Sequence, residues 1–487
     1  MEILFATSEL APYARATALA DFAAALPKNL RALGHNVTVI APKFPGFEAG
    51  GLLLARRLTP LQVTLGGRAF EATLFDGRLS SQIDLILLDV PGLFDRADVY
   101  GPEGEPYADN ALRFAVFSRA VAEVARQRSV AGRPIDVIHC NDWPTALVPA
   151  YVAAAAKEGP SIAGPATVLT VHDASAQGVF AKKEFASLGL DSELWSGKQV
   201  ELGGKVNFLK LGVLKADRVV AVSEAMAVRL TTEGGGFRLD EAFRSRGDAL
   251  RGITNGIDYS VWNPATDATL AARYDAEDIT NKVRCRGALQ RDLGFPIEHD
   301  VPLLVNLQIA PSDEAIDVIA PAVKKVLRAT DAQVVVLVGD DPAVSKKMAA
   351  GAARIEGRIA LLEVVTPSLI HKLAAGADFV MVGGAGDVGG VQMIAQRYGA
   401  LPIAPAAGAI LDTVIDADAK LTTGTGFVYD DPSATGLIAA IERAFAAKKS
   451  PRWGELVTRV MRLDRSWERP ARRYEQLYRA VGRSASG

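Results

Sequence analysis

The feature that most constrains this chain is an alternation of short apolar runs with longer segments of helical apolar spacing. The alternation occurs in both halves of the 487 residues. The apolar runs include 2–7, 36–41, 83–89, 136–139, 167–171 and 218–223 in the first half, and 302–307, 333–338, 360–365, 378–382 and 402–404 in the second. This pattern is typical of parallel sheets covered by helices on both faces. We therefore predict an α/β fold with two doubly wound domains, whose ligands lie beyond the carboxyl ends of the strands.

The junction between the domains is predicted from turn-forming residues. The run Asn255–Asp258 is a turn signal, and Trp262–Pro264 follows it closely. We place the first domain at 1–258, the second at 259–465 and a C-terminal helical segment at 466–487. The pattern leaves open whether this last helix packs back on the first domain.

Composition excludes several classes of partner. Lys plus Arg is 54 and Asp plus Glu is 56, so the net charge is −2 and favours neither nucleic acid nor a membrane surface. Cys140 and Cys285 belong to no metal-ligand pattern, and we expect free thiols rather than a disulfide. There is no uncharged apolar stretch of about 18 residues. We expect a cytoplasmic protein without a metal.

The first forty residues hold the candidate ligand site. A strand at 2–7 and a helix at 21–34 are joined by the loop 8–20. In α/β proteins such a loop binds anions, because free backbone N–H groups and the helix dipole point at the ligand. Loops of this kind normally contain glycine. This loop has none but carries Arg15, with Asp21 at the helix start, so the sequence leaves open whether it is a working anion site.

Several motifs along the chain together resemble one family. Besides the opening 1–45, they are His139–Trp143, Thr170–Asp173, Gln177–Gly178, Asn207–Lys210, Gly252–Asp258, Trp262–Pro264, Asp412–Val414, Gly424–Phe427 and Ser466–Trp467. In this order they resemble bacterial glycogen synthases and plant starch synthases. The resemblance implies a GT-B fold, in which two Rossmann-like domains face a central cleft. It also implies transfer of glucose from ADP-glucose to the non-reducing end of an α-1,4-glucan, with retention and without a cofactor.

The resemblance also assigns residues. His172 and Asp21 match the family's catalytic-site histidine and aspartate. The matched substrate-binding positions are Arg15, Asn255, Gly389, Gly390 and Gly408. Each side-chain assignment has a structural alternative: Asp21 as a helix cap, His172 as a buried core histidine, and Asn255 as a turn former.

Other matched positions depart from the family. Thr17 and Ala18 replace two glycines of the family's lysine-containing loop, in which Arg15 stands for the lysine. Ile309 and Glu314 stand at the positions of an arginine and a lysine that face the diphosphate, and Gly386 stands at the glutamate position. Two cations thus become one apolar and one negative residue, which reverses the local field at a leaving diphosphate.

These departures leave three hypotheses. The first is a divergent ADP-glucose-dependent glycogen synthase, in which Lys182, Lys183 or Lys210 could supply the missing positive charge. The second is a catalytically impaired or inactive glucan-binding protein that associates with an active glycogen synthase. The third is a glycosyltransferase that uses another sugar nucleotide.

Overall fold

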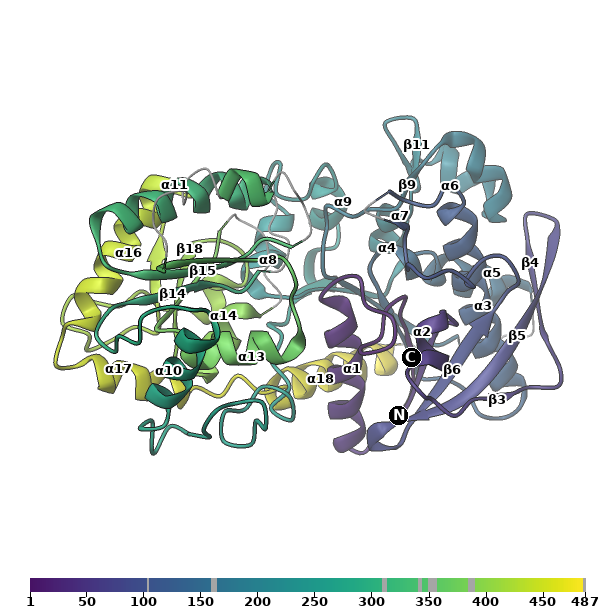
Figure 1. Ribbon diagram of the computed structural model, residues 1–487. Coiled ribbons are helices and arrows are strands. Elements are labelled where there is room, and N and C mark those ends of the chain that lie inside the picture. The colour runs from purple at the N-terminus through teal and green to yellow at the C-terminus, as the bar shows by residue number, and fades with distance from the viewer. Residues whose placement is uncertain are drawn as a thin grey trace. The chain divides into compact units, whose positions relative to one another are not determined.

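The computed structural model describes residues 1–102, 105–158, 164–308, 313–339, 344–348, 357–383 and 390–484. The chain forms two compact units. Unit 1 comprises Met1–Asn255 with Trp467–Gly487, and unit 2 comprises Gly256–Ser466. Figure 1 shows a mixed α/β arrangement within each unit. The domain limits from the sequence, at 258/259 and 465/466, lie within three residues of the unit limits.

Unit 1 is built on one large sheet. Its strands are β1 (Glu2–Ala6), β2 (Asn36–Pro42), β3 (Ala55–Arg56), β4 (Leu61–Leu65), β5 (Arg68–Leu79), β6 (Ile83–Asp89), β7 (Val137–Asn141), β8 (Ala166–Val171), β12 (Arg218–Ala221) and β13 (Leu250–Gly252). The order is β13-β12-β8-β7-β1-β2-β6-β5-β3, with β4 paired to β5. The strands from β13 to β6 are parallel, and β5 runs antiparallel to β3, β4 and β6. A smaller antiparallel sheet contains β9 (Val179–Phe180), β10 (Glu201–Leu202) and β11 (Lys205–Asn207).

Helices cover the sheet of unit 1. They are α1 (Leu19–Ala32), α2 (Pro45–Ala49), α3 (Asn110–Val130), α4 (Asp142–Thr145), α5 (Val148–Glu158), α6 (Ser192–Ser196), α7 (Phe208–Lys215), α8 (Glu224–Leu230), α9 (Asp240–Arg244) and α18 (Glu468–Ser484), with the 3₁₀ helices η1 (Ser80–Gln82), η3 (Lys182–Leu188) and η4 (Gly247–Ala249). Because both faces are covered, central strands are apolar throughout: Ile3 to Ala6 of β1 are at most 1% exposed.

The last helix, α18, packs on unit 1. Tyr478 of this helix contacts the buried His139 of β7, with 2.5 Å between the hydroxyl oxygen and Nδ1. Trp467, just before the helix, meets Phe22 of α1 edge to face at 5.4 Å between ring centroids. Arg473 forms an ion pair with Glu224 at 2.6 Å. The C-terminal helix therefore packs back on unit 1, a point that the sequence pattern left open.

Unit 2 has its own parallel sheet and its own core. The strands are β14 (Leu303–Asn306), β15 (Gln333–Leu337), β16 (Ile359–Leu362), β17 (Phe379–Met381), β18 (Leu401–Pro405) and β19 (Phe427–Tyr429), in the order β16-β15-β14-β17-β18-β19. The described helices are α10 (Lys282–Asp292), α11 (Asp313–Ala329), α13 (Pro367–Gly376), α14 (Val391–Arg397), α15 (Ile410–Thr413), α16 (Ala434–Lys448) and α17 (Trp453–Met461). Two doubly wound sheets were predicted, and the fold prediction is confirmed.

The structure confirms several details of the sequence prediction and corrects the start of the first helix. The predicted hairpin around Gly66 and Gly67 is confirmed as β4 and β5. The first helix begins at Leu19 rather than at Asp21, and Ala18 is its N-cap. Cys140 and Cys285 are buried free thiols, as predicted. Among the described helices, none combines the length and the apolar character needed to cross a bilayer.

Candidate active site

The candidate site of unit 1 lies where several parallel strands end. The loop between β1 and α1 contains Arg15. Asn141 ends β7 and Asp142 follows it, while His172 follows β8. Because β1, β7 and β8 are adjacent and parallel, their carboxyl ends meet at one edge of the sheet.

Glu9 organises the loop between β1 and α1. Its side chain is fully buried. One carboxylate oxygen accepts hydrogen bonds from the backbone N–H groups of Ala16 and Thr17, at 2.8 and 2.6 Å. The other accepts from the Thr17 hydroxyl at 2.9 Å and from the Tyr100 hydroxyl at 2.8 Å. Glu9 therefore engages two backbone amides of the loop, which are then not free for an anion.

Arg15 and Asp21 form a bidentate ion pair. The guanidinium donates to both carboxylate oxygens, at 2.8 and 2.5 Å. Both side chains are more than half exposed, at 54% and 61%. The capping interpretation of Asp21 is wrong, because α1 already begins at Leu19 and Asp21 lies in its first turn. In this structure, the charge of Arg15 is therefore matched by Asp21 rather than left unpaired.

His172 is held in one orientation by neighbours from β7. Its backbone N–H donates to the Asp142 carboxylate at 2.7 Å, and its Nε2 lies 3.1 Å from the Asn141 side-chain oxygen. The Asn141 amide nitrogen donates to the carbonyl of Ala6 at 3.0 Å, which fixes which end of the amide faces the ring. Nε2 of His172 must then carry the proton, so Nδ1 is a free acceptor. Phe22 packs against the ring edge to face at 4.3 Å.

Burial keeps this imidazole neutral. Removal from water lowers the pKa of His172 to about 3, because the charged form loses its hydration. The half-buried ring can thus accept a hydrogen bond at Nδ1 but is not an acid at neutral pH. The alternative of a fully satisfied core histidine is wrong for this residue, since no described group bonds to Nδ1.

Asp142 positions His172 through a strained backbone. Its φ is +51°, in the left-handed region that residues with a side chain rarely adopt. This corner between β7 and α4 turns the carboxylate toward the backbone N–H groups of His172 and Asp173, at 2.7 and 3.4 Å. Burial raises the pKa of Asp142 well above its ordinary value. Strain of this kind persists where surrounding contacts impose it, commonly at functional sites.

Asn255 offers an acceptor without a partner. Its backbone N–H donates to the carbonyl of Val222 at 3.3 Å. Its side-chain oxygen is buried and has no hydrogen-bond partner among the described residues. A buried unpaired acceptor is unfavourable unless a ligand or water satisfies it, so a turn-forming role alone does not account for this side chain.

Fewer of the family-matched positions in unit 2 are described. Gly390 has φ +79° and is the N-cap of α14, and its carbonyl accepts from the amides of Met393 and Ile394. Gly408 has φ +51° with open space where a Cβ would lie. Glu314 is exposed in the first turn of α11, where a carboxylate uses the positive end of the helix dipole. Ile309, Gly386 and Gly389 lie outside the described residues.

The substitute cations suggested by the sequence have other partners. Lys210 donates to the carbonyls of Lys198 and Glu201, each at 2.7 Å. Lys182 lies over the ring of Trp195 at 5.3 Å, and Lys183 lies 4.0 Å from Glu184. These contacts hold local structure and give no support to a role in charge neutralisation.

Sequence reasoning missed the residues that support the site. Glu9, Tyr100, Asn141 and Asp142 received no role, although the last two stand in the quoted motif His139–Trp143. Their partners lie far away in sequence, such as Tyr100 for Glu9. Among the residues that the structure describes, no cluster of three or more His, Cys, Asp or Glu could hold a metal ion.

Comparison with known proteins identifies the family. Residues 2–245 match the model of the starch synthase catalytic domain. A glycogen synthase from Anaeromyxobacter sp. strain Fw109-5 is 37% identical over 484 residues, covering 99% of both chains. One from Thioalkalivibrio sulfidiphilus is 36% identical over 489 residues, covering 98% of this chain and 99% of the relative. A solved catalytic domain of starch synthase IV from Arabidopsis thaliana, bound to ADP and acarbose, matches with a TM-score of 0.86 and 27% identity over 99% of each chain.

The fold and these matches define a glycosyltransferase of the GT-B class. Within that class, the chain belongs to the family of glycogen synthases and starch synthases. The resemblance inferred from the motifs is thereby confirmed.

Acid should destabilise unit 1 through two of its histidines, the fully buried His139 and the half-buried His172. Burial lowers the pKa of His139 well below the ordinary value and that of His172 to about 3. An unfolded histidine binds a proton below about pH 6.5, whereas in the folded state each of these two histidines binds it only at its lower pKa. Between these two pH values, the free energy of unfolding therefore falls as the pH falls. The slope is at most about 1.4 kcal/mol per pH unit for each histidine. Urea unfolding at pH 7 and pH 5 measures this difference, and His172→Gln should reduce it.

The exposed His299 provides the control for this prediction. His299→Gln should unfold with the same pH dependence as the unmodified chain. An unchanged slope in His172→Gln would contradict the neutral state that we assign to the imidazole.

Proposed function

We propose that this chain transfers glucose from ADP-glucose to the non-reducing end of an α-1,4-glucan with retention, at a low rate. The observation that carries the proposal is the neutral His172, oriented by Asn141 and Asp142 at the strand ends. Family membership supports the same substrates, and the related starch synthase IV was solved with ADP and acarbose.

The groups of unit 1 suit a sugar ligand. A hexose presents hydroxyl donors, and unit 1 offers two acceptors for them. One is Nδ1 of His172, whose other ring nitrogen is engaged by Asn141. The other is the buried side-chain oxygen of Asn255, which has no hydrogen-bond partner among the described residues. Positioning of the sugar lowers the barrier because the reacting groups are already oriented. No metal enters the proposal, so protein groups must stabilise the leaving diphosphate.

Stabilisation of the diphosphate is the weak part of the site. Arg15 is paired with Asp21, and the amides of Ala16 and Thr17 are engaged by Glu9. Glu314 adds a negative charge in the first turn of α11, a place that otherwise favours anions. Removing one preorganised charge stabiliser typically costs about two to three powers of ten in rate. We therefore propose impaired rather than absent turnover.

A transfer assay tests this proposal. Labelled ADP-glucose is incubated with a maltooligosaccharide, the product lengths are measured, and the anomeric configuration of the new linkage is determined by NMR. The proposal expects slow extension by α-linked glucose. Complete lack of extension at high protein concentration, with the protein folded, would overturn it.

A second candidate function follows from the same ion pair. If Arg15 remains paired and no other cation neutralises the diphosphate, the chain would bind glucan without transferring glucose. It would then act as a regulatory or glucan-binding partner of an active glycogen synthase. Glucan binding with no measurable transfer, and a changed rate when an active glycogen synthase is mixed with the chain, would support this alternative.

Release of Arg15 should strengthen nucleotide binding. Asp21→Asn removes the carboxylate charge that Arg15 now matches, and the freed guanidinium can pair with a phosphate. We expect ADP to bind about tenfold more tightly, which corresponds to about 1.4 kcal/mol. Titration calorimetry measures the change. Arg126→Ala, which breaks an exposed pair with Glu123 elsewhere in unit 1, is the control. Unchanged ADP affinity in Asp21→Asn would show that Arg15 does not face the nucleotide.

A further inference from the structure

The rings around Phe22 connect the C-terminal segment of the chain with His172. Phe22 lies in α1, is 3% exposed, and packs edge to face against the His172 ring at 4.3 Å between ring centroids. It also meets two rings of the C-terminal segment edge to face, Trp467 at 5.4 Å and Tyr474 at 6.0 Å. We call these four residues the Phe22 cluster. The cluster places the end of the chain next to the candidate active site.

The two rings from the C-terminal segment are held by burial. Trp467 is 4% exposed and Tyr474 is fully buried. The Tyr474 hydroxyl lies 3.4 Å from Oγ1 of Thr170 in β8, two residues before His172. Because protein interiors are close-packed, a buried ring can shift only when a neighbour leaves space. Loss of the Trp467 indole would therefore let Phe22 move away from His172.

The Phe22 contact restrains His172 in a way that its hydrogen bonds do not. The bond between Nε2 and the Asn141 side-chain oxygen, at 3.1 Å, holds one atom of the ring. The rest of the ring can still swing about that atom. The Phe22 ring, at 76° to the imidazole plane, opposes this movement. The direction of Nδ1, the acceptor that we assign to a sugar hydroxyl, thus depends on where Phe22 lies.

We propose that Trp467 and Tyr474 are positioning residues for glucose transfer, because they hold Phe22 against His172 and so set the direction of Nδ1. The proposal deepens the proposed function and rests on it. Trp467 and Tyr474 act through Phe22. Their effect on rate can still be large, since a misplacement of about 1 Å at a reacting group can cost about 100-fold.

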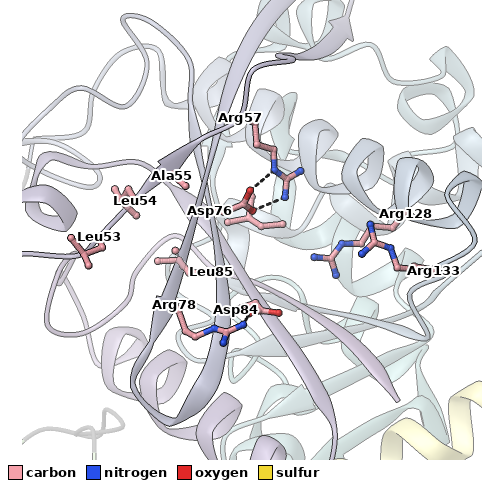
Figure 2. Close-up of a pocket in the computed structure, with 12 residues that line it drawn as sticks. Leu53, Leu54, Ala55, Arg57, Asp76, Arg78, Asp84, Leu85, Arg128 and Arg133 are labelled. Atoms are coloured by element: carbon pink, nitrogen blue, oxygen red, sulfur yellow. Dashed lines mark hydrogen bonds and ion pairs between the residues drawn. The ribbon is translucent and has the colours of Figure 1, made fainter.

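Two buried positions outside the Phe22 cluster provide controls. A cavity of about 790 Å³ lies at the opposite edge of the same sheet, and Figure 2 shows Leu85 of β6 among its lining residues. Leu85 is 1% exposed, so Leu85→Ala removes packing from unit 1 far from the cluster. Val481, 4% exposed, lies about two turns beyond Tyr474 on α18. Val481→Ala therefore loosens the same helix without removing a ring of the cluster.

NMR of the histidine rings in the full chain tests the positioning without any need for turnover. His172→Gln identifies the His172 signals. In the unmodified chain we expect one set of these signals, with the proton on Nε2. Trp467→Leu should shift or split the set, and Trp467→Phe, which keeps a ring beside Phe22, should restore it. Leu85→Ala and Val481→Ala should leave it unchanged.

Kinetics of glucose transfer provide the second readout. Trp467→Leu should lower kcat by about tenfold or more and change KM for the glucan by less than about twofold, because the binding groups remain. Trp467→Phe and the two controls should keep the kcat of the unmodified chain. Phe22→Leu should act like Trp467→Leu in both readouts, and it takes the place of that variant if Trp467→Leu does not fold.

Three results would overturn the proposal. One is a folded Trp467→Leu chain whose His172 signals match those of the unmodified chain. Another is an equal change of these signals in Leu85→Ala or Val481→Ala, since the effect would then follow from any loss of packing. The third is an unchanged kcat in a variant whose His172 signals have moved. A lack of transfer by the unmodified chain would instead overturn the proposed function, and the ring signals distinguish the two failures.

Discussion

His172→Ala is expected to reduce glucose transfer from ADP-glucose by at least about 100-fold, the typical cost of removing one preorganised polar group from an active site. The ring is neutral, and its orientation is fixed from two sides by Asn141 and Asp142. Its Nδ1 is the acceptor that we assign to a sugar hydroxyl. Alanine removes this acceptor and leaves space beside Phe22.

The comparison of kcat with KM separates chemistry from binding. If the Nδ1 contact strengthens in the transition state, kcat should fall while the affinity for the glucan changes little. Asn141→Leu should have a smaller effect, because it releases the ring orientation without removing the acceptor. His299→Ala, at an exposed position of unit 2, serves as the control. Unchanged transfer in His172→Ala would contradict the assigned role.

Glu9→Leu is expected to destabilise unit 1 by about 2–4 kcal/mol, since a buried group that loses its acceptor costs about 1–3 kcal/mol. The glutamate accepts from four donors on two oxygens. Leucine offers no acceptor, so the two backbone N–H groups lose their partner, whereas the Thr17 and Tyr100 hydroxyls can turn to other partners. Urea unfolding followed by tryptophan fluorescence measures the loss.

Hydrogen exchange locates this effect within the loop. The amides of Ala16 and Thr17 should exchange at least tenfold faster in Glu9→Leu, because their acceptor is lost. Glu71→Gln, at an exposed position of β5, should change neither stability nor exchange. Equal exchange of the 8–20 segment in Glu9→Leu and in the unmodified chain would show that Glu9 does not hold this loop.

The fold was predictable because its signals are local. The buried strands β1 and β14 read as continuous apolar runs, and helical spacing between the runs indicated a doubly wound sheet. Motif order then indicated the family. The start of α1 was misplaced by two residues, because an alanine N-cap at position 18 gives no capping signal in the sequence.

The pairing and protonation of the side chains in the candidate site could not be predicted in the same way. Arg15 and Asp21 were predicted to have separate roles, because their spacing in the sequence does not show that they pair with each other. Glu9 was overlooked because the sequence does not show that its side chain turns back onto residues 16 and 17, or that Tyr100, 91 residues away, also contacts it. The protonation state of His172 depends on burial and on the amide orientation of Asn141, which are properties of the folded chain alone.

The most direct test of the account is titration calorimetry of the purified chain with ADP and, separately, with a short maltooligosaccharide. The central claim is that the chain keeps its sugar-positioning groups while its diphosphate site is weakened. The account predicts that the glucan binds saturably and that ADP binds only in the millimolar range. Saturable ADP binding in the micromolar range would contradict it, because other residues would then neutralise the diphosphate.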